Sequence, residues 1–492
     1  MNARLIKETR ALLPMFACTL PLIVVPQLIW PSEGVGYFAL GVACVVMAGS
    51  SFGTEFQHRT ISLLLSQPIP RSALWREKML VLGAGLVMSL AVLVACLAVS
   101  RPAMDGQDWL VLALIPLCAF CGAPFWTLSL RHGIVGMVSA VAVPCGILAA
   151  YGLVMEELVG SEPAPAALVT AVVSLLFIYC AVVYWLGYAK FKRLEAVDAP
   201  SRELGLPAGL EAVLVAPLTK VSSRFRGPFA TLLKKEFRVQ QISFLLAGVF
   251  VLIAVGGFCL AKRHPEVATG ILGGDIFIYA LILPLIAGAV SVAEERGWGI
   301  AEWHLTLPPS ALKQWSAKML VALATSLVLG LLLPTAVFFV ADPVFNQPGP
   351  RTSLPPAFAI LSWVLGQMLM TSVAVYAASF SRTTLQAILA ALVILIAGGG
   401  AIWLAICSAH HAALAPVQWM GQPRIDEWLI LPLLSGALAF VLWLFQWFAW
   451  SNFRRFGLPP LRLIVQLSMT LVAVWLIAWF FFSALIFLNG GF

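Results

Sequence analysis

The sequence predicts an all-α polytopic membrane protein with two parallel six-helix repeats and one extra C-terminal transmembrane helix. Three observations support this prediction. Of the 492 residues, 61% are hydrophobic and only 11% are charged, whereas soluble chains average about a quarter charged. Thirteen uncharged runs are long enough to cross a bilayer, at roughly 20 residues per crossing. Finally, one polar loop returns in the same register 240 positions later.

The predicted spans follow one another with short polar connections. Each should be a helix, because an open strand cannot satisfy its backbone hydrogen bonds in lipid. If the N-terminus is cytoplasmic and each run crosses once, 25 of the 30 Lys and Arg residues face the cytoplasm. This asymmetry predicts a multi-pass membrane protein with a cytoplasmic N-terminus. The runs are 11–32, 34–54, 79–100, 109–130, 132–155, 163–189, 239–261, 276–293, 319–341, 352–381, 383–423, 428–453 and 463–492.

The net charge of +8 is explained by this topology. It needs no nucleic-acid partner, and the basic segments are expected to face the lipid bilayer.

A charged amphipathic segment precedes each predicted unit. Residues 1–13 mix apolar and charged side chains and predict a short helix in the membrane interface. Residues 231–238 repeat this pattern, and both segments contain Lys-Glu-x-Arg, at 7–10 and 235–238.

The second span carries Gly41, Gly49 and Gly53. Small residues of this kind predict close helix packing within the membrane.

The loop from Glu55 to Leu80 is the clearest repeated element. An ungapped shift of 240 gives seven identities in its twenty-six positions. Residues 56–65 predict a short helix, Pro68 and Pro70 should end it, and a second helix should begin near Ser72 and continue into the third span. The identical pairs are Glu55 and Glu295, Leu65 and Leu305, Pro68 and Pro308, Trp75 and Trp315, Lys78 and Lys318, Met79 and Met319, and Leu80 and Leu320.

The repeat divides the chain into four segments. Residues 1–193 form a first six-span unit, and 229–456 form a second. Residues 194–228 form a cytoplasmic linker with five prolines, too short for an independent domain of ordinary size. An even number of spans per unit makes the repeat parallel, and 457–492 carry the additional span.

Several chemistries are not expected on this chain. There is no GxxxxGK[ST] motif, so the chain should not hydrolyse ATP itself. No spacing supplies His410-His411 with the further ligands that a metal site needs, and no Ser/His/Asp or Cys/His arrangement can be argued from spacing. The chain is therefore predicted to be no enzyme, to hold no cofactor and to lack catalytic and metal sites. A membrane-embedded enzyme would need clustered His, Asp or Glu at one membrane face, and the spacing suggests none. No predicted span has Lys, Arg, Asp or Glu near its centre; Gln367 and Gln446 are the polar exceptions. This pattern disfavours an ion-coupled carrier, but an ATPase-independent secondary carrier or flippase stays open as the alternative.

The two repeated loops carry a family resemblance. The pattern Glu55, Arg59-Thr60, Leu64-Leu65, Pro68, Arg71 and Lys78 resembles the cytoplasmic signature of type-two ATP-binding-cassette (ABC) transporter permeases. The pattern Glu294-Glu295-Arg296, Leu305-x-Leu307-Pro308 and Lys318 resembles a second copy. The resemblance covers both six-span units and excludes the last span.

The resemblance implies a function and a location in the cell (cytoplasmic) membrane. In that family, the membrane subunit of an ATP-driven exporter docks its first cytoplasmic loop on a separate ABC ATPase subunit, which binds the ATP. Those loops would be 55–78 and 294–318, and the exported substrate is not identified. The second copy has Gly297-Trp298-Gly299 in place of Gln57-His58-Arg59 and lacks an arginine equivalent to Arg71. The two docking surfaces are therefore expected to differ.

Each repeated side chain allows two interpretations. Glu55 and Glu295 either fix the loop, by pairing with an arginine or capping the next helix, or are ordinary charged helix ends. Trp75 and Trp315 either contact the ATPase or anchor the helix in the membrane interface. Lys78 and Lys318 either snorkel at the membrane boundary or contact the partner. The predicted ATPase-coupling residues are Glu55, Arg59, Arg71, Trp75, Lys78, Glu295, Arg296, Trp315 and Lys318.

Overall fold

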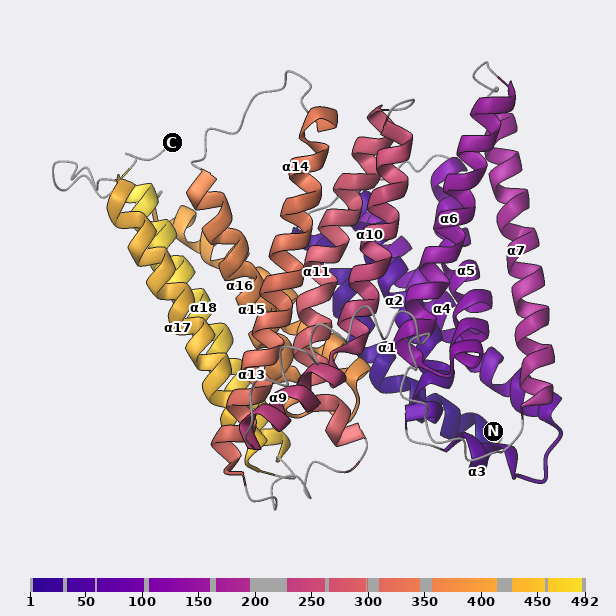
Figure 1. The fold of residues 1–492 in the computed structure, drawn as a ribbon, viewed down its shortest axis with the longest axis horizontal. Helices are drawn as coiled ribbons and strands as arrows, with labels where there is room; N and C mark the ends of the chain where they lie inside the picture. The colour runs from indigo at the N-terminus through magenta and orange to yellow at the C-terminus, as the bar shows by residue number, and fades with distance from the viewer. Residues whose placement is uncertain are drawn as a thin grey trace. The chain divides into compact units, whose positions relative to one another are not determined.

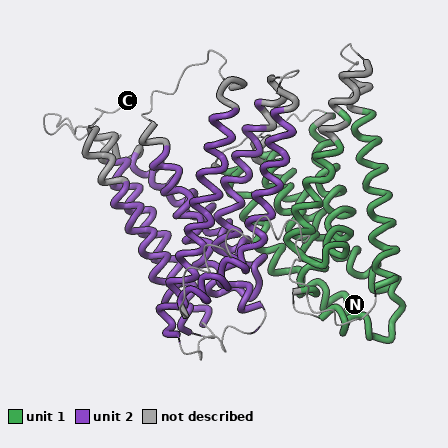
Figure 2. Tube along the Cα trace, viewed as in Figure 1, with its two compact units in different colours: residues 1–202 green, residues 203–492 purple. Residues whose placement is uncertain are grey.

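The computed structural model divides the chain into two compact units, unit 1 (Met1–Arg202) and unit 2 (Glu203–Phe492), which are coloured separately in Figure 2. Each unit is described by itself. The structure describes residues 3–29, 33–57, 60–100, 106–159, 165–194, 228–261, 265–297, 299, 309–345, 356–413, 427–455 and 459–488. The predicted linker 194–228 lies outside these residues except for Leu194 and Pro228, and so does Arg59.

Helices make up most of the described residues (Figure 1). Unit 1 contains α1 (Ala3–Ile29), α2 (Glu33–Gln57), α3 (Ile61–Leu65), α4 (Arg71–Ser100), α5 (Gly106–Leu130), α6 (Gly133–Val159) and α7 (Pro165–Arg193). Unit 2 contains α9 (Pro228–Val239), α10 (Gln241–Ala261), α11 (Pro265–Gly297), α13 (Ala311–Leu327), the π-helix η1 (Val328–Leu332), α14 (Leu333–Phe345), α15 (Pro356–Ala378), α16 (Thr384–Ala413), α17 (Glu427–Phe453) and α18 (Pro460–Leu488).

This architecture confirms an all-α polytopic membrane protein. Each of the thirteen uncharged runs coincides with a helix, and the run 319–341 coincides with the succession α13, η1 and α14. Among the described residues, eleven helices are long and apolar enough to cross a membrane. The chain is therefore a multi-pass membrane protein.

The two units repeat the same pattern of helix neighbours. In unit 1, α2 packs on α1, α5 and α6, and α5 also packs on α6 and α7. In unit 2, α11 packs correspondingly on α10, α15 and α16, and α15 also packs on α16 and α17. The second span of each unit, α2 in unit 1 and α11 in unit 2, is thus central to its bundle. This position explains why α2 and α11 are the most buried of the candidate spans.

Small residues bring the central helices close to their neighbours, as predicted for two of the three glycines in the second span. A Cβ on Gly53 would lie 3.1 Å from the Cα of Gly133 in α6, and one on Gly49 would clash with Met137. Gly41 has no such close contact; its nearest atom lies at 4.0 Å. In unit 2, a Cβ on Gly288 of α11 would lie 2.5 Å from the carbonyl oxygen of Thr371 in α15.

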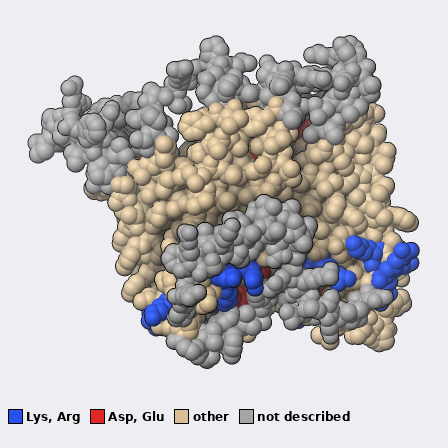
Figure 3. Space-filling view, viewed as in Figure 1, with Lys and Arg blue, Asp and Glu red and all other residues tan. Residues whose placement is uncertain are grey.

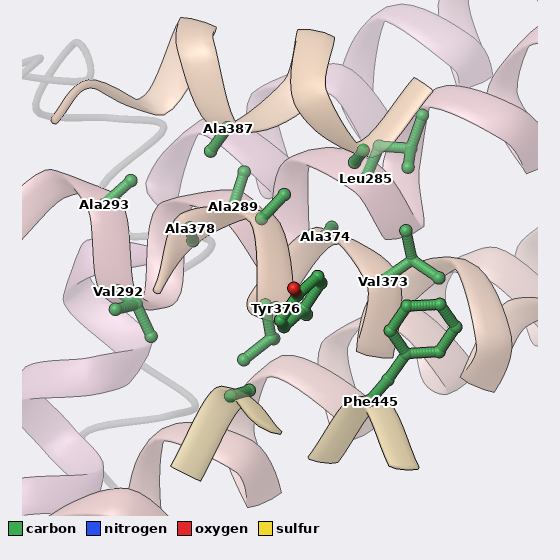
Figure 4. Close-up of a cluster of buried hydrophobic side chains, with 14 of the residues drawn as sticks. Leu285, Ala289, Val292, Ala293, Val373, Ala374, Tyr376, Ala378, Ala387 and Phe445 are labelled. Atoms are coloured by element: carbon green, nitrogen blue, oxygen red, sulfur yellow. The ribbon is translucent and has the colours of Figure 1, made fainter. Parts of the chain in front are cut away.

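The core of unit 2 lies where α11, α15 and α16 meet α17 (Figure 4). Alanines and valines of α11 and α15 face one another there, and Tyr376 and Phe445 fill the space beside them. The last helix, α18, packs on α16 and α17 and belongs to unit 2. A buried amide pair fixes its position, because Asn452 of α17 and Gln466 of α18 donate to each other's side-chain oxygens at 3.0 and 3.1 Å.

The segments expected at the membrane interface differ between the units. In unit 2, α9 is a separate helix that ends at Val239 and lies across one end of the bundle (Figure 1). In unit 1, residues 3–13 are continuous with the first span in α1, although Pro14, Pro21 and Pro26 lie inside that helix. The loop of unit 1 forms the short α3, and α4 begins at Arg71 directly after Pro70, one residue before the predicted start.

Basic side chains gather at one end of the helices in each unit. On the face drawn in Figure 3, the visible Lys and Arg residues lie toward the end that carries α3 in unit 1 and α9 in unit 2. The described parts of the predicted coupling segments lie at these same ends: the segment 55–78 contains α3, and Glu295 and Lys318 pair with residues of α9.

Candidate functional site

The first charged node consists of Glu8, Glu55 and Lys78. These residues come from α1, α2 and α4, so one cluster joins three helices. The Lys78 ammonium donates to Glu8 Oε2 at 2.8 Å and to Glu55 Oε1 at 3.1 Å. It also donates to the carbonyl oxygen of Ser51 at 3.3 Å. The Lys78 side chain is only 3% exposed.

The second charged node, Glu236, Glu295 and Lys318, has the same construction. Lys318 Nζ lies 2.9 Å from Glu236 Oε1, 2.8 Å from Glu295 Oε1 and 3.1 Å from the carbonyl oxygen of Ser291. Its side chain is 2% exposed. The lysine, the second glutamate and the serine all sit 240 positions after their counterparts in the first node. The remaining glutamate belongs to the Lys-Glu-x-Arg segment in both units.

Each node satisfies its buried lysine completely. An ammonium has three N–H donors, and in both nodes two carboxylates and one backbone carbonyl accept them. A buried charge is tolerated only when it is paired and hydrogen-bonded. Both lysines therefore stay inside the bundle, which corrects the expectation that they snorkel to the boundary or contact a partner.

In the third span of each unit, which is α4 in unit 1 and begins with α13 in unit 2, the node lysine and the tryptophan point in the same direction. Trp75, Lys78, Met79 and Leu82 are all buried, with the spacing of one helix face. In α13 the equivalent positions Trp315, Lys318 and Met319 are buried in the same way. Burial of this face holds the helix against the bundle directly after the proline-containing loop.

The paired tryptophans pack inside their own units. Trp75 is 2% exposed and Trp315 is 7% exposed. Trp75 stacks on Phe52 and contacts Phe191 of α7, with ring centroids 5.5 Å apart in both pairs. Trp315 contacts Phe453 of α17 at 5.2 Å. Both expectations for these residues, a contact with the ATPase and an interfacial anchor, are wrong because neither indole is accessible.

Phe191 and Phe453 occupy equivalent places, since Lys190-Phe-Lys-Arg193 matches Asn452-Phe-Arg-Arg455. The tryptophan contact therefore ties the third span to the end of the sixth span in each unit, α4 to α7 and α13 to α17.

An arginine also reaches the end of the sixth span in each unit, from the third span in unit 1 and from the second span in unit 2. Arg71 of α4 donates to the carbonyl oxygen of Lys192 near the end of α7. Arg296 of α11 donates to the carbonyl oxygen of Asn452 near the end of α17, at 3.5 Å. Both arginines therefore donate to backbone carbonyls in the last turn of the sixth span. The second copy lacks an Arg71 equivalent in register, yet Arg296 reaches this turn from the preceding helix, at Asn452, which matches Lys190.

The two nodes differ in exposure and in their additional partners. The glutamates of the second node are 3% exposed, whereas Glu8 and Glu55 are 15% and 14% exposed. Lys235 pairs with Glu295 in the second node, while Thr60 donates to Glu55 in the first. Burial raises the pKa of Glu236, and the nearby Glu295 carboxylate acts in the same direction.

A further carboxyl group lies beside the second node. Glu294 stands where unit 1 has Thr54, and its Oε2 is buried without a hydrogen-bond partner among the described residues. This extra acid agrees with the prediction that the two loops are inequivalent.

Sequence reasoning missed Glu8 and Glu236 as node residues. The repeated Lys-Glu-x-Arg segment was the available signal, because it returns before each unit. The described residues contain no cluster of three or more His, Cys, Asp or Glu suited to hold a metal ion. Comparisons of the chain with protein-family models, with curated proteins and with solved structures find no match.

Proposed function

We propose that this chain is the membrane-spanning subunit of an ATP-driven ABC exporter, in which the loops 55–78 and 294–318 dock on separate ATPase subunits. One observation carries the proposal. Each unit fastens its N-terminal segment and the two helices that flank the loop to a single buried lysine. Movement at either loop would thus be passed to several helices together.

The energetics favour a mechanical role for the charged nodes. A buried ion pair is seldom worth more than well-packed apolar residues of the same volume, whereas breaking one costs about 3–5 kcal/mol. Simple stability would therefore not require the same ionic arrangement in both units. A mechanical role explains why both units contain the lysine–glutamate cluster, because a contact that transmits force must keep its geometry when one of its helices is pushed.

Exposed apolar side chains on the loops provide the surface for a partner. Leu63 in α3 is 67% exposed, and Leu312 in the first turn of α13 is 62% exposed. Both lie at the end of the unit that carries the basic residues, where the sequence predicts the cytoplasm. Under this proposal these leucines meet the ATPase, and the buried nodes behind them carry the movement into the spans.

Purification from native membranes tests the proposal directly. The chain is extracted in mild detergent, and co-purifying soluble proteins are identified by mass spectrometry. We expect a protein with a GxxxxGK[ST] motif in stoichiometric amount, and its loss from the Leu63→Asp and Leu312→Asp variants. Phe480→Asp serves as the control, because Phe480 is similarly exposed, at 69%, on α18. The absence of such a protein from the intact chain would contradict the proposal.

One observation favours the alternative, an ATPase-independent carrier. Asp275 lies near the start of the apolar part of α11, and its Oδ2 is buried with no hydrogen-bond partner in the described part of the chain. Acidic groups within membrane spans often mark ion pathways. Transport that collapses with the ion gradient and is abolished by Asp275→Asn would favour the carrier.

A further inference from the structure

A cavity of about 410 Å³ lies between the end of α17 and the beginning of α18. Its walls are mainly apolar, and its polar groups include one arginine and one hydroxyl. The side chains that matter here are Trp447 and Ser451 from α17, and Leu461, Arg462, Val465 and Met469 from α18. The cavity lies beside the basic connection that joins the two helices.

The polar part of this cavity is positively charged. Arg462 donates from Nη2 to Ser451 Oγ at 2.8 Å, which engages one of the five N–H donors of a guanidinium. No acidic side chain among the described residues forms an ion pair with Arg462. Arg454 and Arg455 are exposed in the same connection. The site therefore presents uncompensated positive charge and suits an anion.

An exposed apolar stripe on α18 begins at the cavity and extends beyond it. Leu461, Val465, Met469, Val472 and Leu476 are each about half exposed or more, from 48% to 71%. Their spacing of three and four residues places them on one helix face. This stripe leads from Arg462 into the apolar part of the helix, where a lipid chain would lie.

We propose that this cavity binds one anionic phospholipid, with its phosphate at Arg462 and an acyl chain along the exposed stripe of α18. Free phosphate would not use the apolar walls, and a neutral lipid would not use the uncompensated arginine. Basic pockets between transmembrane helices are a recognised way to hold anionic headgroups. The bound lipid would bridge α17 and α18 beside the buried Asn452 and Gln466 pair. This site is independent of the proposed transport function.

The test measures lipid retention by the full chain. The protein is reconstituted in nanodiscs of phosphatidylcholine with a minor fraction of phosphatidylglycerol, released into mild detergent and examined by native mass spectrometry. We expect one retained phosphatidylglycerol. Arg462→Gln should weaken its retention roughly fivefold, the effect of about 1 kcal/mol for one arginine. Arg382→Gln, at an exposed position in another turn, should leave retention unchanged.

A second variant separates the cavity from the charge. Met469→Trp fills the apolar part while Arg462 is kept, so it should also release the lipid, and thermal unfolding verifies that each variant is folded. Equal losses in Arg462→Gln and Arg382→Gln would overturn the proposal, since only general surface charge would then act. Retention that survives Met469→Trp, or that inorganic phosphate alone abolishes, would overturn it as well.

Discussion

Removal of the lysine from the second node should destabilise the protein more than the same change in the first node. Lys318→Met leaves Glu236 and Glu295, each 3% exposed, with the partly exposed Lys235 as their remaining cation. Breaking a buried pair of this kind costs about 3–5 kcal/mol. Lys78→Met leaves glutamates that are 15% and 14% exposed. Water can partly solvate these, so the cost should fall to about 1–3 kcal/mol.

The assay is reversible unfolding in mixed micelles, followed by tryptophan fluorescence. Lys190→Met serves as the control because Lys190 is exposed at the end of α7, and it should change the free energy of unfolding by less than about 0.5 kcal/mol. Combining Lys318→Met with Glu236→Gln and Glu295→Gln should recover much of the loss, because the two carboxylates that Lys318 no longer neutralises are then removed. Equal costs for Lys318→Met and Lys190→Met would refute the reasoning.

Three further predictions concern the contacts around the nodes. Gly53→Ile should separate α2 from α6, because even an added Cβ would lie 3.1 Å from the Cα of Gly133. Cysteine cross-linking between the two helices should fall, and unchanged cross-linking would contradict this. Trp75→Ala should cost about 3–5 kcal/mol, the usual cost for a buried aromatic side chain, and a denaturant titration that shows less than about 1 kcal/mol would argue against its burial. Arg296→Gln should remove the arginine donor from the carbonyl of Asn452 and speed hydrogen exchange in the last turn of α17. Exchange in α18 beyond its midpoint serves as the internal reference.

The helices could be predicted from the sequence because each span is specified locally. A run of about 20 apolar residues has one stable arrangement in lipid, whatever its neighbours are. The proline-ended loop was predictable for the same reason, since Pro70 excludes helix at a fixed point and α4 begins directly after it. The register of the repeat also placed Glu55 and Glu295 in equivalent positions.

The interiors of the nodes could not be predicted, because their partners are distant in sequence. Lys78 pairs with Glu8, 70 residues away, and Lys318 pairs with Glu236, 82 residues away. A lysine at the end of a span has the same local pattern whether it snorkels or is buried. The burial of Trp75 likewise depends on Phe191 in α7, which no local pattern indicates.

The most direct test of the central claim is photo-crosslinking in intact cells. A photoreactive amino acid is placed at Leu63 and, separately, at Leu312, with Phe480 as the control position, and the cross-linked products are identified by mass spectrometry. If both loops dock on ATPase subunits, each loop position should capture a protein with a GxxxxGK[ST] motif, and Phe480 should capture none. Lipid adducts alone at both loop positions would contradict the claim that these loops couple the chain to an ATPase.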